Sequence, residues 1–264
     1  MLDHIQQVIR QLELDYKIKV LYACEAGSRA WGFPSQNSDY DVRFIYVHRM
    51  DWYLTIDQQR DTIEVPNRDA VSIPINDQLD LSGWELTKAL RLLRKSNPSL
   101  FEWLHSSTVY YQAYSAIEQM RLMAKKVFSP VVGVNHYVRM AKGNFRDCIQ
   151  GNERKIKRYI NVLRPLLAAK WIEKFQTIPP VNFHILLETL VVPGDLADEI
   201  VKIIQFKMNG EEWGTDLNID FLHSFIQEEI EHLEGYAGKT HLDVPNPTKE
   251  LNQLFRDTLK EVWE

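Results

Sequence analysis

The feature that most constrains this sequence is the spacing between a Gly-Ser pair and an Asp-x-Asp pair. Gly27 and Ser28 follow an apolar run typical of a buried strand, and Asp39 and Asp41 lie at the start of a second such run. Side chains two residues apart on a strand project from one face, so the two carboxylates would repel unless a cation lies between them. Glycine lets a ligand approach the backbone, and the serine hydroxyl can donate to a phosphate oxygen. The pattern predicts a metal–triphosphate site, with Mg²⁺ as the natural ion.

A third carboxylate, Asp80, lies in a short apolar run at 78–81, which is a poor position for an unpaired charge. If this run forms a strand beside the one that carries Asp39 and Asp41, the three acids can hold two metal ions. One ion would activate an attacking hydroxyl, and the other would stabilise a leaving pyrophosphate. Asp80 is also a candidate for accepting the proton of the nucleophile. The alternative interpretation of Asp80 is a solvated strand end or an ion pair with an arginine or lysine.

The hydrophobic pattern changes along the chain. Strands are expected at 19–24, 40–47, 62–65 and 78–81, and Ser82 is expected to stop the last one and to form a capping box with Glu85. Beyond residue 113 the periodicity is helical, with helices expected at 115–128, 131–150, 153–174, 183–191, 195–208, 219–234 and 248–263. Pro165 should kink the third of these or mark a helix start. These patterns predict an α+β fold. Residues 1–112 would form a small mixed β-sheet domain with flanking helices, and residues 113–264 an all-helical C-terminal domain.

Charge is distributed unevenly over the 264 residues, although the net charge is only −5. The stretch 139–174 holds ten Lys/Arg and three Asp/Glu, a net charge of +7, whereas 211–234 holds eight Asp/Glu and no Lys or Arg. A local basic surface suggests phosphate handling and permits RNA binding, although a solvated helix face explains the charges equally simply. Within this stretch, the candidate nucleotide-binding residues are Lys142, Lys157, Tyr159 and Arg164. Lys157 and Arg164 are two helical turns apart, and Tyr159 can stack on a base.

Composition excludes several other classes of protein. Two cysteines make neither a secreted disulfide framework nor a zinc quartet, and no run approaches the ~20 apolar residues of a membrane span. The first 15 residues alternate charged and apolar positions and lack the apolar core of a signal peptide. A cytoplasmic protein without membrane contact is expected, and no feature indicates its oligomeric state.

At the Gly-Ser and Asp-x-Asp pairs, the sequence resembles the nucleotidyltransferase superfamily of DNA polymerase beta. More narrowly, it resembles the RNA repair pathway DNA polymerase beta family of bacteria and phages. The segments that carry this resemblance are 27–32, 38–44, 80–86, 95–98, 136–137, 157–159 and 164–168. The similarity therefore extends over almost the whole chain.

The resemblance implies a role for each matching residue. Gly27 and Ser28 would grip the triphosphate of an NTP, with ATP the expected substrate, and Arg29 would contact its β- or γ-phosphate. Asp39, Asp41 and Asp80 would ligate two Mg²⁺ ions, for which Mn²⁺ is the alternative.

The implied activity is transfer of a nucleoside monophosphate to a hydroxyl acceptor with release of pyrophosphate. The family name favours an RNA 3′ end as the acceptor. Two alternatives stay open at this point. The same chemistry could act on a small molecule or a protein side chain, or the protein could be a non-catalytic nucleotide-binding regulator or antitoxin.

Overall fold

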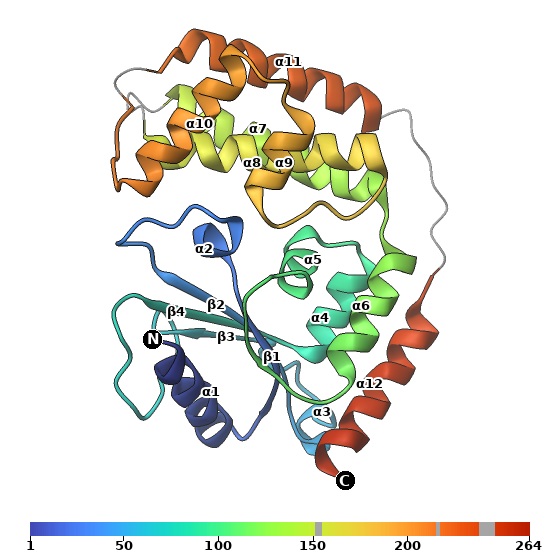
Figure 1. The fold of residues 1–264 in the computed structure, drawn as a ribbon. Coiled ribbons are helices and arrows are strands. Elements are labelled where there is room, and N and C mark those ends of the chain that lie inside the picture. Colours follow the sequence, from blue (N-terminus) through green and yellow to red (C-terminus); the bar gives the residue numbers. More distant parts are fainter. Residues whose placement is uncertain (151–154, 215–216, 238–245) are drawn as a thin grey trace. The chain divides into compact units, whose positions relative to one another are not determined.

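The computed structural model describes residues 1–150, 155–214, 217–237 and 246–264 (Figure 1). They form two compact units, each described here by itself. Unit 1 comprises Met1–Ala30, Asp39–Val127 and the described part of Pro245–Glu264, and unit 2 comprises Trp31–Ser38 and the described part of Phe128–Val244. Both units are discontinuous in sequence, unlike the expected domains 1–112 and 113–264, and that domain boundary stays a prediction.

Within the described residues, unit 1 is built on a five-stranded mixed sheet of order β3-β4-β2-β1-β5. Its strands are β1 (Lys19–Glu25), β2 (Tyr40–Val47), β3 (Thr62–Val65), β4 (Leu79–Glu85) and β5 (Val109–Gln112). The central pair β2 and β4 is parallel, and the other pairs are antiparallel. The mixed sheet and the α+β class are confirmed. The edge strand β5 was not expected, because four residues with no buried position give little alternation to detect.

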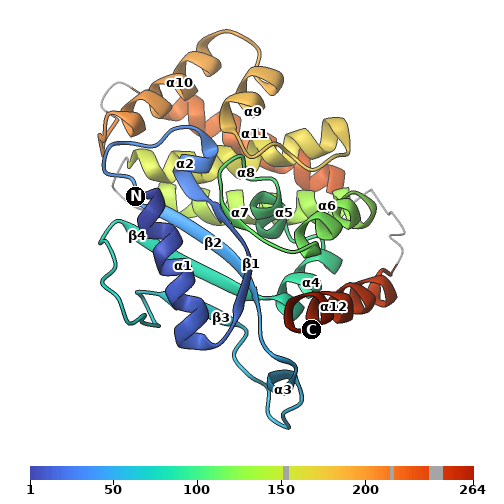
Figure 2. The same cartoon turned by 60° about the horizontal axis from the view of Figure 1, so that its bottom comes forward.

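One face of the sheet is covered by α1 (Leu2–Tyr16), which lies across the strands in Figure 2. Its apolar residues recur at helical spacing and pack against Val42, Phe44 and Tyr46 of β2. Because successive side chains alternate across a strand, Asp41 and Arg43 project from the opposite face, as the sequence predicts.

That opposite face packs against a helical layer. The layer comprises α4 (Leu86–Arg94), α5 (Pro98–Leu104) and α6 (Ala116–Val127). Trp84 of β4 stacks on Trp103 of α5 with ring centroids 3.7 Å apart. Two further helices belong to unit 1: the short α3 (Met50–Tyr53), and α12 (Thr248–Trp263), which runs beside α4 and α6 in Figure 1.

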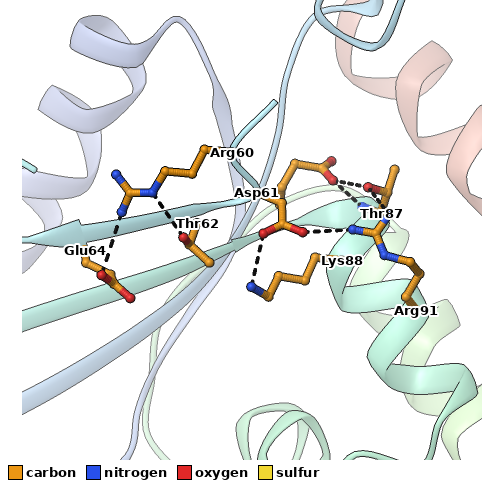
Figure 3. A network of polar contacts seen from close by, with 8 residues as sticks. Arg60, Asp61, Thr62, Glu64, Thr87, Lys88 and Arg91 are labelled. Atoms are coloured by element: carbon orange, nitrogen blue, oxygen red, sulfur yellow. Dashed lines mark hydrogen bonds and ion pairs between the residues drawn. The ribbon is translucent and has the colours of Figure 1, made fainter. Parts of the chain in front are cut away.

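The expected capping box at Ser82 is wrong. Strand β4 continues through Ser82 to Glu85, because it pairs with β2 on one side and with β3 on the other. Helix α4 instead begins at Leu86, and the N-cap is Glu85, whose carboxylate accepts a hydrogen bond from the Thr87 amide at 2.7 Å. Asp61, just before β3, joins that strand to α4 by accepting from Lys88 at 3.1 Å and from Arg91 at 2.9 Å (Figure 3).

Unit 2 is helical apart from connecting segments. Its helices are α7 (Pro130–Gln150), α8 (Ile156–Phe175), α9 (Phe183–Leu190), α10 (Asp195–Met208) and α11 (Ile219–Ala237). Helix α8 is the central element, since residues from its whole circumference are buried. It runs on through Pro165, which excludes a helix start there, and the alternative of a kink stays a prediction. Residues 153 and 154 of the expected helix lie outside the described residues.

The connecting segment Trp31–Ser38 packs within unit 2 and not with the sheet that precedes and follows it. The short helix α2 (Gly27–Trp31) leads into this segment. Phe33 is fully buried and makes an edge contact with the Phe183 ring, with centroids 5.7 Å apart. The Nε2 atom of His184 lies 3.3 Å from the carbonyl oxygen of Gly32.

Across the described part of the chain, no helix combines the length and the apolar character that a bilayer crossing requires.

Candidate functional site

Three strands bring the predicted site residues to one edge of the sheet. The parallel strands β2 and β4 begin at this edge, with Asp41 directly opposite Asp80 in the register. The antiparallel strand β1 ends there, with Glu25 opposite Val42. The chain then enters α2 at Gly27, and the Ala26 amide donates to the Asp41 carbonyl oxygen at 2.9 Å. The sheet topology therefore gathers residues that are more than 50 positions apart in the sequence.

Asp41 and Asp80 share one arginine. The Nη2 atom of Arg43 lies 2.8 Å from Oδ1 of Asp41, and its Nη1 atom lies 2.9 Å from Oδ2 of Asp80. The three side chains are partly buried, with 29%, 33% and 19% exposure for Asp41, Asp80 and Arg43. Asp80 also accepts a hydrogen bond from the Asn67 amide at 3.1 Å. Two carboxylates thus lie side by side because a cation lies between them, and that cation is an arginine.

Gly27 lies directly against the Asp41 carboxylate. Its φ angle is +59°, in the left-handed region, and a Cβ atom at this position would lie 2.0 Å from Oδ2 of Asp41. Only glycine combines that backbone conformation with so close an approach. The Gly-Ser pair and the Asp-x-Asp pair are therefore in contact through Gly27 and Asp41.

The remaining unit 1 candidates lie around this contact. Ser28 is partly exposed in α2. Arg29 covers the ring of Tyr40, with its guanidinium carbon 3.8 Å from the ring centroid, and its Nε donates to the Asp39 carbonyl oxygen at 3.1 Å. Asp39 is exposed and precedes β2, which begins at Tyr40. The strand backbone therefore fixes the direction of the Asp41 side chain, but not that of the Asp39 side chain.

The donor set suits a hard divalent cation only in part. Asp41 and Asp80 offer two carboxylates to one position, which is the chemistry that Mg²⁺ prefers. No group of three or more His, Cys, Asp or Glu side chains that could hold a metal ion occurs among the described residues. The structure thus brings two of the three predicted acids together, and the full set with Asp39 stays a prediction.

Sequence reasoning missed Glu25, the buried carboxylate of the site. Only 1% exposed, it accepts a hydrogen bond from the Asp41 amide at 2.8 Å and another from the Tyr110 hydroxyl. Burial raises the pKa of Glu25, and the two hydrogen bonds partly oppose that rise. The position of Glu25 at the end of an otherwise apolar strand is the sequence signal that could have indicated its importance. Its hydrogen bond with the Asp41 amide holds the backbone at that residue.

The four candidates of the helical half lie in unit 2 and differ in exposure. Lys142 and Lys157 are exposed, and Lys142 pairs with Glu234 of α11 at 2.7 Å. Tyr159 is 3% exposed, and its ring stacks on His223. Arg164 is 4% exposed, with its guanidinium carbon 4.3 Å from the centroid of the Trp31 ring. The burial of Tyr159 does not favour base stacking, and roles for these four residues stay predictions.

Helix α11 explains much of the charge pattern. This helix carries most of the acidic run, and it pairs with the basic helices α7 and α8 through Lys142–Glu234 and Lys170–Glu229. The two segments of opposite charge are therefore partners within unit 2, and the basic stretch presents less net positive charge than its composition suggests.

Comparisons with known proteins found a matching family model and similar proteins. The family model described as "RlaP: RNA repair pathway DNA polymerase beta family" matches residues 1–257. The "Uncharacterized protein YcgL" of Bacillus subtilis (strain 168) is 48% identical over 256 residues, which cover 97% of this chain and 95% of that protein.

Two solved structures are similar at 11% identity. The spectinomycin adenyltransferase AAD(9) from Enterococcus faecialis, with ATP and spectinomycin, has a TM-score of 0.48 and matches 87% of this chain and 98% of its own. A nucleotidyltransferase-like protein from Exiguobacterium sibiricum 255-15 has a TM-score of 0.34 and matches 98% and 81%.

Proposed function

Since the chain belongs to the RNA repair pathway DNA polymerase beta family and is a nucleotidyltransferase, we propose that it is Mg²⁺-dependent and acts on RNA 3′ ends. The 3′ hydroxyl attacks the α-phosphorus of an NTP, with ATP as the proposed donor. A nucleoside monophosphate is transferred, and pyrophosphate leaves. The cytoplasm is the proposed location, supported by two cysteines that are both free.

The observation that carries this proposal is the pairing of Asp41 with Asp80 beside Gly27. Two parallel strands present carboxylates to one cation position, and a glycine without a side chain lets the Gly-Ser turn lie directly against the Asp41 carboxylate. Phosphoryl transfer needs positioning and electrostatic stabilisation more than covalent chemistry from the protein, and this arrangement provides both.

Each residue has a proposed part in the reaction. Asp41 and Asp80 would hold the metal together with Asp39, and a bound Mg²⁺ would stabilise charge on the phosphates and lower the pKa of the attacking hydroxyl. Asp80 accepts the proton of that hydroxyl at a carboxylate oxygen. The Ser28 hydroxyl and Arg29 donate to phosphate oxygens, with the backbone at Gly27 close to the triphosphate.

The test is transfer of label from α-³²P-labelled NTPs to RNA in the presence of Mg²⁺. Asp39→Ala and Asp41→Ala should each lower transfer by a factor of about 10³ or more, while circular dichroism and the thermal midpoint stay near the wild-type values. Asp257→Ala, which removes an exposed carboxylate that accepts from Gln253 within α12, is the control and should keep wild-type transfer. Near-normal turnover by either aspartate variant would refute the metal assignment.

A second candidate is the same transfer to a small molecule or a protein side chain. The ion pairs between α11 and the basic helices favour it, because they reduce the positive charge available to RNA. The salt dependence of RNA binding separates the two: several phosphate contacts make the affinity fall steeply between 50 and 200 mM salt. A flat dependence, together with label in small molecules or protein, would support the second candidate. Nucleotide binding without any transfer would indicate a regulator.

A further inference from the structure

Arg43 occupies the position between the two carboxylates that the metal ion would need. Besides its ion pairs with Asp41 and Asp80, its Nη1 donates to the carbonyl oxygens of Val42 at 3.2 Å and Asp80 at 3.3 Å. Its side chain is 19% exposed. The guanidinium is therefore held at a defined place on the sheet, by backbone as well as by carboxylates.

We propose that Arg43 is a positioning residue of the transfer reaction. Its guanidinium is a built-in counterion that holds Asp41 and Asp80 together before substrate binds, and it must leave them when a divalent ion binds. This inference rests on the proposed function, which assigns these carboxylates to the metal.

The charges explain why such a residue matters. The group formed by Asp41, Asp80 and Arg43 has a formal net charge of −1. Each carboxylate in it accepts a charge-assisted hydrogen bond from the guanidinium. A divalent ion arriving alone must break both ion pairs and leave the guanidinium with backbone carbonyls in place of its two carboxylates. The free ion therefore binds weakly.

A nucleoside triphosphate changes this balance. Its phosphates bring further oxygen ligands for the metal and acceptors that match the planar fork of a guanidinium. The metal and the nucleotide should then bind cooperatively, because each offsets part of the free energy that is lost when the ion pairs of Arg43 break. Arg43 thereby makes occupancy of the metal site depend on substrate.

The test measures binding of Mn²⁺ alone to the full-length protein, without nucleotide, from the electron paramagnetic resonance signal of the free ion. Arg43→Gln should bind Mn²⁺ at least tenfold more tightly than the wild type, because the carboxylates lose their internal cation. Arg43→Lys, which keeps the charge, should stay within about threefold of the wild type. The double variant R43Q/D80N should lose the gain. An Arg43→Gln protein that binds Mn²⁺ no more tightly than the wild type would overturn the proposal.

Arg60 provides a matched control. It also pairs with two carboxylates of unit 1, those of Asp69 at 2.7 Å and Glu64 at 3.7 Å, and it lies beside Glu64 in Figure 3. Arg60→Gln should leave Mn²⁺ affinity unchanged. An equal gain in Arg60→Gln would overturn the proposal, because the effect would then follow from any freed carboxylate pair.

A measurement on the wild type covers the case in which Arg43→Gln does not fold. With ¹⁵N-labelled arginine, the Nε resonance of Arg43, assigned by its absence in Arg43→Lys, should shift with Mg²⁺ and a non-hydrolysable NTP together, but not with the same concentration of Mg²⁺ alone. An equal shift with Mg²⁺ alone would contradict the inference. Because neither readout requires turnover, lack of transfer would refute the proposed function without deciding the role of Arg43.

Discussion

At the scale of single residues, Gly27 has little freedom to change. Alanine at this position would adopt a left-handed backbone conformation that costs roughly 1–2 kcal/mol, and its Cβ would displace the Asp41 carboxylate. Gly27→Ala should therefore lower transfer at least 100-fold and lower the free energy of unfolding by about 1–2 kcal/mol. Single-turnover kinetics and urea unfolding measure the two effects.

The control for that substitution is Gly143→Ala in α7. A Cβ there meets no atom within 4 Å, so this variant should keep wild-type transfer and unfold at the same or a slightly higher urea concentration. Full activity in Gly27→Ala would show that the carboxylate position does not matter for the reaction.

His48 should make the stability of the protein pH-dependent. Burial lowers the pKa of this imidazole to about 4, and the ring stacks on Trp52 with centroids 4.0 Å apart. Between that value and the ordinary pKa near 6.5, the unfolded chain binds the proton and the folded chain does not, so stability falls as the pH falls. Because the imidazole is partly exposed and solvent screens its charge, the wild type should lose about 1 kcal/mol more than His48→Phe from pH 7 to pH 5, as measured by urea unfolding at both pH values. Parallel pH profiles would contradict this prediction.

Residue spacing predicted only part of the site. Gly27, Asp41 and Asp80 could be found because their chemistry is unusual beside apolar strands. The partner of Asp80 could be anticipated only as some arginine or lysine, since the choice of Arg43 depends on the parallel register of β2 with β4. Glu25 stayed hidden because a single buried carboxylate has meaning only when its partners, the Asp41 amide and the Tyr110 hydroxyl, are known.

At the scale of elements, local sequence signals failed where a neighbouring strand decided the structure. Ser82 to Glu85 has the spacing of a capping box, but pairing with β2 and β3 on both sides keeps these residues in β4. The long helices beyond residue 113 were predicted well because each has an apolar face that repeats over several turns.

Gly83 shows how tightly β4 is packed in the sheet. A Cβ atom at this position would lie 2.2 Å from the ring of Phe44, which is fully buried. Gly83→Ala should therefore lower the free energy of unfolding by about 1–3 kcal/mol through overpacking. Ser82→Ala, one residue earlier and without a capping role, should change it by less than about 0.5 kcal/mol. Denaturant titration distinguishes the two, and an equal loss in Ser82→Ala would contradict the overpacking argument.

At the scale of the whole chain, segments that are far apart in the sequence contact one another in the fold. Acidic α11 pairs with the basic helices of unit 2, and C-terminal α12 returns to unit 1, the unit of the N-terminal sheet. A division of the sequence into two consecutive domains predicts neither of these two contacts. Hydrophobic periodicity identifies a helix, but it does not identify the element against which that helix packs. Which distant segments pack together depends on complementary surfaces, and these surfaces are visible only in the folded units.

The return of α12 predicts that the last seven residues stabilise unit 1. The family match ends at residue 257, inside this helix, yet the residues beyond it make specific contacts. Leu259 is buried, the indole N–H of Trp263 donates to the His48 carbonyl oxygen at 2.9 Å, and Glu261 accepts from the Ser115 amide at 3.0 Å. A chain ending at Asp257 should lose about 3 kcal/mol of unfolding free energy, roughly one buried leucine and two hydrogen bonds. A chain lacking only Glu264 should match the wild type in the same urea titration. Equal midpoints for the two truncated chains would mean that the end of α12 contributes nothing to the stability of the sheet.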